Sequence, residues 1–223
     1  MKPKIMRTPG FRQLAFFFIL GPALLTLSAA AHSPVRPQGL PQVSQTGYHL
    51  NPARELELLK KILAFERNWK IEARDTLVVG ILFQSSNPIS VWTMEDWISL
   101  PSPSLPEDNR AELPGFLLKP VDLESPQPLE DSLREMKVRF LYLTPLELSK
   151  KPKLLPYIFK ACEKLRVGTA TAVPEYVEAG AALGLIWTGE KFQVVINLEA
   201  ARAQGLNFSS QFLRLATVRK GHD

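Results

Sequence analysis

The sequence has 223 residues, of which 45% are hydrophobic, and its 27 Lys and Arg against 22 Asp and Glu give a formal net charge of +5. This length and apolar content suit one domain with its own hydrophobic core. The excess positive charge belongs to the start of the chain: residues 1–31 hold four basic residues and no acidic one, which leaves 23 basic against 22 acidic residues in the rest. A nearly neutral remainder without a clustered basic face argues against a nucleic-acid partner.

The first 31 residues have the three parts of a secretory signal peptide. Basic residues precede an apolar run that Gly21-Pro22 interrupts, and Ala29 and Ala31 stand at the −3 and −1 positions that a signal peptidase reads. An uncleaved anchor is the alternative, but the apolar run is shorter than the roughly 20 residues that span a bilayer. We therefore predict a cleaved signal peptide over residues 1–31 and an exported mature protein without stable membrane insertion.

The mature chain begins with a segment of distinct composition. Residues 32–50 are rich in Pro, Gln and Ser, which predicts a flexible linker. Asn51-Pro52 then has the residue types of a helix start, with Asn as the N-cap and Pro at the first helical position. Residues 76–83 form a nearly unbroken apolar run, typical of a strand in a parallel sheet that is covered on both faces.

Strands and helices alternate along the middle of the chain. The pattern predicts an edge strand at 115–121, where Pro120 is tolerated, further strands at 138–144 and 167–173, and helices after Asn87-Pro88, at 128–136 and at 154–165. Such alternation implies right-handed crossovers between parallel strands.

In the C-terminal third, the spacing of the apolar residues changes from that of strands to that of helices. A strand at 182–187, a turn at Thr188-Gly189 and a strand at 191–198 predict a β-hairpin, and helical spacing comes after it with Gly205 as a C-terminal cap. Ser209 and Ser210 supply N-caps for a last short helix. The predicted fold is therefore a single α/β domain over residues 51–220, Rossmann-like, with a mainly parallel sheet flanked by helices and a C-terminal β-hairpin.

Few residues have a pattern typical of catalysis or of metal binding. His32, His49 and His222 lie in segments expected to be mobile, and neither a phosphate-binding loop nor a nucleophile elbow is present in the sequence. Cys162 is the single cysteine, which excludes an intramolecular disulfide, and its apolar neighbours at helical spacing favour a buried thiol. We predict no enzyme activity, no cofactor and no metal.

Polar residues stand after the carboxyl ends of several predicted strands, where doubly wound sheets bind ligands and partners. The loop after the first strand combines hydroxyls, amides and a helix N-terminus, which suit a small anion. Ordinary turn and cap chemistry explains the same residues, and we favour it. The candidate ligand or partner residues in these loops are Gln84, Ser85, Ser86, Asn87, Thr144, Thr171, Glu175 and Tyr176.

The C-terminal third also carries a family resemblance. The run VVINLEAARAQGL at 194–206, then SSQFLRLA at 209–216, resembles the C-terminal signature of the YfiR-like family of periplasmic bacterial proteins. PEYVEAGAALGL at 174–185 resembles the segment that precedes that signature. The resemblance extends over roughly residues 52–218 and is strongest at the C-terminal end. The signature is long and mixed in residue type, so it outweighs any short motif.

The resemblance implies a periplasmic, non-enzymatic regulator. Such a protein binds and represses the periplasmic domain of an inner-membrane signalling protein, which in the characterised system is a diguanylate cyclase of c-di-GMP signalling. It also allows a homodimer. The best-studied members carry disulfides and this chain has one cysteine, so a redox role for such bonds does not carry over. Two alternatives stay open: a small-solute-sensing module that feeds a sensor kinase, and an enzyme whose site is assembled from distant segments.

Overall fold

The computed structural model describes residues 51–68, 76–101, 115–149 and 151–219. All of them lie in one compact unit, Arg36–Asp223. The predicted signal peptide, the predicted linker and the three histidines lie outside the described residues.

Helices and strands alternate through most of this unit. The helices are α1 (Pro52–Leu63), α2 (Pro88–Ile98), α3 (Leu129–Glu135), α4 (Leu154–Leu165), α5 (Pro174–Ala179), α6 (Leu198–Ala203) and α7 (Ser210–Leu213). The strands are β1 (Thr76–Phe83), β2 (Gly115–Asp122), β3 (Phe140–Leu143), β4 (Gly168–Thr171), β5 (Leu183–Trp187), β6 (Phe192–Asn197) and β7 (Thr217–Arg219).

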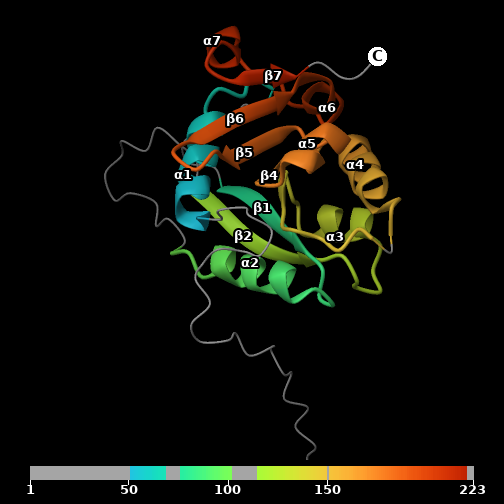
Figure 1. Ribbon diagram of the computed structural model, residues 1–223. Helices are drawn as coiled ribbons and strands as arrows, with labels where there is room; N and C mark the ends of the chain where they lie inside the picture. Colours follow the sequence, from blue (N-terminus) through green and yellow to red (C-terminus); the bar gives the residue numbers. More distant parts are fainter. Residues whose placement is uncertain (1–50, 69–75, 102–114, 150, 220–223) are drawn as a thin grey trace, which may run out of the picture. The chain divides into compact units, whose positions relative to one another are not determined.

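The described strands form one seven-stranded sheet in the order β2-β1-β3-β4-β5-β6-β7 (Figure 1). Neighbouring strands are parallel except β5 and β6, which form the antiparallel hairpin. Both the predicted α/β fold class and the C-terminal hairpin are therefore confirmed. The proline-containing strand β2 lies at an edge, where a missing backbone N–H leaves no gap in an interior ladder.

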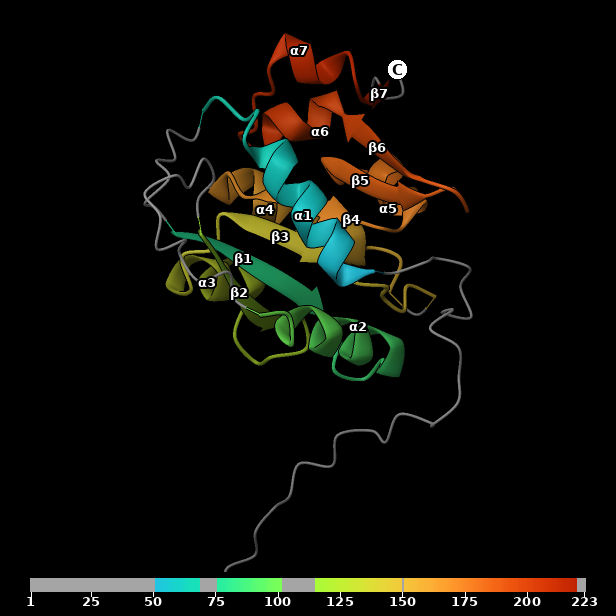
Figure 2. The ribbon, with the colours of Figure 1, turned by 90° about the vertical axis from the view of Figure 1, so that its left-hand side faces the viewer.

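Each face of the sheet has its own hydrophobic core. Side chains alternate along a strand, so Leu77, Val79 and Ile81 of β1 face one core while Leu82 faces the other. In Figure 2, α1 lies in front of the sheet, and α3 and α4 lie behind it. The first core contains apolar residues of α1, α2 and α7, and the second contains those of α3, α4 and α5. Burial on both faces explains the unbroken apolar run of β1.

The helix boundaries depend on local capping chemistry. The side chain of Asn51 accepts the backbone N–H of Arg54 at 3.1 Å, and Ser209 does the same for Phe212 at 3.3 Å. Gly205 comes after α6 with a φ of +83°, a conformation that glycine adopts without steric cost. These caps confirm three boundaries that the residue types predict.

Three features differ from the sequence-based pattern. Residues 174–179 form the short helix α5 where we expected a loop, and a four-residue loop, closed by Thr188 N–H donating to the Lys191 carbonyl at 3.0 Å, replaces the two-residue turn. Strand β7 is not predicted by the sequence. Its three residues are exposed and have no periodicity, and only pairing with β6 makes them a strand.

Replacing Ile196 by Asp should unfold or strongly destabilise the protein. Ile196 is fully buried in β6, so the variant places a charge without a partner in the first core, at a cost of several kcal/mol. Urea denaturation measures this cost. The control is Gln193→Asp on the same strand, where the side chain is exposed and the loss should stay below about 1 kcal/mol. Equal stability of the two variants would show that the strand register is wrong.

Candidate functional site

The order of the strands creates one switch point in the sheet. The chain passes from β1 outward to β2 and then returns to β3 on the other side of β1. The loops after β1 and β3 therefore leave the sheet in different directions, and the carboxyl edge between them is the usual place for a site in this class of fold. Residues 84–87 come after β1, and residues 144–149 come after β3.

Buried hydroxyls connect the first turns of these two loops. The backbone N–H of Gln84 donates to Ser90 Oγ at 2.9 Å, and Ser90 Oγ lies 2.6 Å from Thr144 Oγ1. Thr144 Oγ1 in turn donates to the carbonyl of Leu82 at 2.9 Å. Thr144 is fully buried, and its hydrogen bonds hold the end of β1 against the end of β3.

The side-chain amides of Gln84 and Asn87 form two further hydrogen bonds between the same two loops. Gln84 Oε1 accepts the backbone N–H of Glu147 at 2.9 Å, and Asn87 Nδ2 donates to the carbonyl of Pro145 at 3.4 Å. Asn87 Oδ1 also accepts the backbone N–H of Ile89 at 3.1 Å, which caps α2. The cap chemistry that we favoured for Asn87 is present.

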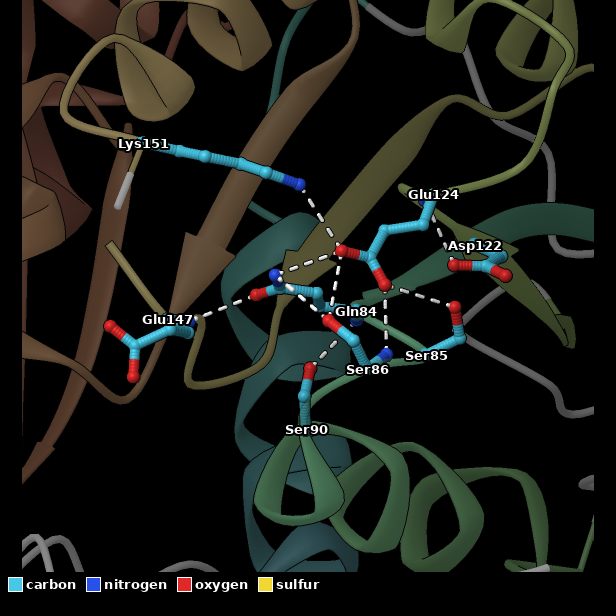
Figure 3. A network of polar contacts seen from close by, with 8 residues as sticks. All are labelled: Gln84, Ser85, Ser86, Ser90, Asp122, Glu124, Glu147 and Lys151. Atoms are coloured by element: carbon cyan, nitrogen blue, oxygen red, sulfur yellow. Dashed lines mark hydrogen bonds and ion pairs between the residues drawn. The ribbon is translucent and has the colours of Figure 1, made fainter. Parts of the chain in front are cut away.

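The carboxylate of Glu124 occupies the centre of this edge (Figure 3). One oxygen, Oε1, accepts from Gln84 Nε2 at 3.1 Å, Ser86 Oγ at 2.9 Å and Lys151 Nζ at 3.2 Å. The other, Oε2, accepts from the Ser86 backbone N–H at 2.8 Å and Ser85 Oγ at 3.2 Å. We call Gln84, Ser85, Ser86 and Lys151 the Glu124 cradle. Its donors suit an anion, and in this structure the anion is the chain's own carboxylate.

These contacts stabilise the ionised form of Glu124. Burial opposes ionisation, but the hydrogen bonds from Gln84, Ser86 and Lys151 outweigh it and lower the pKa of Glu124 to about 2. The side chain of Glu124 is 22% exposed, so solvent screens part of the ion pair with Lys151. The carboxylate stays charged at any physiological pH and ties the segment after β2 to the loops after β1 and β3.

The remaining candidates lie at the end of β4 and in α5: Thr171 is the last residue of β4, and Glu175 and Tyr176 belong to α5. Thr171 Oγ1 donates to the carbonyl of Leu143 at 3.2 Å, and the hydroxyl of Tyr176 accepts the backbone N–H of Leu146 at 2.8 Å. Both side chains are buried, whereas Glu175 is exposed at the start of α5. Of the eight predicted site residues, only Ser85, Ser86 and Glu175 are exposed, and Asn87 is half-buried.

Sequence reasoning missed Glu124 and Lys151. Glu124 stands after a strand that ends in a proline-rich region, and Lys151 lies in a run of lysines, so neither has a spacing that marks it. A usable signal was the position of Glu124 at the carboxyl end of a strand next to β1, since carboxyl ends of parallel strands meet at one edge.

Within the described ranges, no group of three or more His, Cys, Asp and Glu residues could hold a metal ion. None of the described helices is long and apolar enough to cross a membrane. Cys162 is fully buried, and burial raises the pKa of its thiol to about 12, so it is an inert core residue, as we expected.

Comparison with known families gives a match over the C-terminal part of the unit. The family model described as YfiR/HmsC-like matches residues 115–217, from the first residue of β2 to the first of β7. This match confirms the resemblance that the sequence motifs indicate. A search of curated proteins gives no match.

Solved structures show the same class of fold. One is the ligand-free, open structure of CD0873, a substrate binding protein with adhesive properties from Clostridium difficile (TM-score 0.51, 13% identity, 78% of this chain and 61% of that chain). Another is a conserved domain protein from Vibrio cholerae (TM-score 0.50, 17% identity, 75% and 59%). A third is the ABC domain in complex with L-Trp from Streptococcus pneumonia (TM-score 0.49, 16% identity, 76% and 61%). The chain covers about 60% of the length of each of these proteins. At such identities, the similarity to the first two shows the fold alone.

Replacing Glu124 by Gln should lower the free energy of unfolding by about 1–2 kcal/mol at pH 7, because an NH₂ group then faces the donors of the cradle. The pKa of Glu124 in the folded protein, about 2, lies below its usual value of 4.5. The stabilisation is therefore complete above about pH 4.5 and is lost as the pH falls towards 2.

Chemical denaturation at pH 7 and at pH 3 tests both statements. The difference between wild type and Glu124→Gln should be smaller at pH 3. Glu190→Gln serves as the matched control, since Glu190 is exposed in the loop between β5 and β6 and its replacement should be nearly neutral. A Glu124→Gln variant as stable as wild type at pH 7 would contradict the cradle's role.

Proposed function

We propose that this protein is a regulator that binds the periplasmic domain of an inner-membrane signalling protein. The proposal rests on the match of residues 115–217 to the YfiR/HmsC-like family model. That family is known for periplasmic regulators of c-di-GMP signalling and is regulatory rather than catalytic. The receptor that fits this role is a diguanylate cyclase, which the bound regulator holds inactive. The family match is the observation that carries the proposal.

The mechanism is a shift between two conformations of the receptor. A regulator that binds the inactive conformation more tightly raises its population by the ratio of the two affinities. A tenfold preference is about 1.4 kcal/mol, which moves an evenly populated receptor to about 90% inactive. Such a regulator needs a rigid surface, because ordering mobile loops on binding would reduce the affinity.

The carboxyl edge of the sheet has the rigidity that this mechanism needs. Glu124 joins three chain segments there, and Gln84, Thr144, Thr171 and Tyr176 are buried and bonded within the chain. They hold the loops in place, and Ser85, Ser86 and Glu175 are the predicted site residues that are exposed at this edge. We therefore place the receptor contact at this edge.

Capture from membranes tests the proposal. Tagged protein comprising residues 32–223 is mixed with solubilised inner membranes, and bound proteins are identified by mass spectrometry. The expected result is specific enrichment of a diguanylate cyclase, and addition of the regulator should lower the activity of that cyclase. Capture of no membrane signalling protein, or a cyclase whose activity is unchanged by the regulator, would refute the proposal.

The contact surface is tested by reversing one charge at the carboxyl edge. Glu175→Lys should weaken binding of the captured receptor at least about tenfold while the melting temperature stays within a few degrees, because Glu175 is exposed. Lys137→Glu is the matched control: Lys137 is exposed and precedes β3, at the opposite edge of the sheet. Equal effects of the two charge reversals would show that the receptor contact does not lie at the carboxyl edge.

Solute sensing for a sensor kinase is the second candidate function, and one observation favours it. The Glu124 cradle already binds a carboxylate, so its donors have the chemistry to bind a carboxylate of a small molecule once Glu124 moves away. Native mass spectrometry of protein purified under mild conditions would reveal such a ligand. A bound small molecule together with no captured cyclase would favour this function.

A further inference from the structure

Glu55 is a carboxyl group enclosed in the first core. It lies in the first turn of α1 and has no exposed surface. Its Oε1 accepts the backbone N–H of Asn51 at 3.2 Å, and its Oε2 accepts the hydroxyl of Tyr142 from β3. None of the ion pairs formed by the described residues includes Glu55. A buried carboxylate with two hydrogen bonds and no cation is a costly group to keep charged.

The surroundings of Glu55 are aromatic and apolar. Trp97 of α2 packs on Tyr142 with ring centroids 4.2 Å apart, and both side chains are fully buried. The buried indole of Trp97 is not among the donors to the carboxyl group, which are the Asn51 backbone N–H and the Tyr142 hydroxyl. On α1, the neighbouring Leu56 and Leu59 belong to the same apolar core.

These surroundings favour the protonated carboxyl. Burial raises the pKa of Glu55 to about 7, although the hydrogen bonds from Tyr142 and Asn51 act in the opposite direction. The pKa of Tyr142 is itself raised well above its usual value, mainly by burial and then by Glu55, so the phenol stays neutral. The charged residues of α1 and α2, which are Arg54, Glu57, Lys60, Lys61, Glu95 and Asp96, are not among the groups that act on Glu55.

We propose that Glu55 makes the docking of α1 on the sheet depend on protons. The neutral carboxyl group seats the start of α1 against Tyr142, and its ionisation loosens the helix from the first core. The contact thus forms a proton-dependent latch between the N-terminal helix and the centre of the sheet. An exported protein with such a latch responds to the pH of its surroundings.

The direction of the response is set by linkage. The docked state binds the proton more tightly than an open state in which Glu55 meets water with its usual pKa of 4.5. Docking is therefore strongest below pH 4.5, weakens as the pH rises and levels off above about pH 7. Between pH 6 and pH 8 the equilibrium constant for opening of α1 should rise about tenfold.

Hydrogen exchange of the whole domain tests the latch. Exchange of amides in residues 52–63 is measured at pH 6 and pH 8, corrected for intrinsic rates and compared with α4. Protection of α1 should fall about tenfold in wild type and in Glu57→Gln, a control at an exposed position on the same helix, and should stay constant in Glu55→Gln. Constant protection in wild type, or an equal fall in Glu55→Gln or in α4, would overturn the proposal.

Tyr142→Phe provides a second test that keeps Glu55 in place. The tyrosine hydroxyl favours the ionised carboxylate, so its removal should move the titration of Glu55 to higher pH. Carbon-13 NMR of the glutamate carboxyl groups, with Glu55→Gln to assign the signal, measures the midpoint directly. A midpoint near pH 4.5 in wild type, or one that falls in Tyr142→Phe, would show that no latch exists.

Discussion

Burial of both faces of a parallel sheet is the constraint on which the rest of this structure depends. In the central strands β1 and β3, alternate side chains enter two separate cores, so apolar residues are needed at successive positions. Helices must then cover each face, and the chain supplies them as crossovers between parallel strands. A group of polar side chains gathers at the carboxyl edge, where β1 and β3 diverge.

The hydrogen-bond donors at the carboxyl edge find their acceptor within the same chain. In this class of fold the switch point is often open to a ligand, and its donors include a helix N-terminus. Here Glu124 supplies a carboxylate to the donors of Gln84, Ser85, Ser86 and Lys151. Because that carboxylate is covalently part of the chain, the three loops form one fixed surface, a property suited to binding a protein.

Among the described residues, Glu55 is the only carboxyl group that is buried, and its burial beside the apolar first core has a physical consequence. A Leu or Met side chain at position 55 would be buried in the apolar core without the cost of burying an acid. The carboxyl group of Glu55 instead makes the free energy of docking depend on pH. The cradle and the latch depend on pH in opposite directions: the cradle weakens at low pH, and the latch weakens as the pH rises. Five donors keep Glu124 ionised and lower its pKa to about 2, whereas burial raises the pKa of Glu55 to about 7.

The sequence by itself determined the elements whose signals are local. Unbroken apolar runs predicted β1, residue types at Asn51, Gly205 and Ser209 predicted helix boundaries, and the long C-terminal motif indicated the family that residues 115–217 match. Only the tertiary structure decided how polar residues are used. Tyr142 and Glu55 are 87 positions apart, and Gln84 and Glu124 are 40 apart. Strand order brings each pair together, and no periodicity of one segment encodes a partner on another. Strand β7 also depends on a distant partner: its three residues have no strand pattern of their own, and they form a strand because they pair with β6.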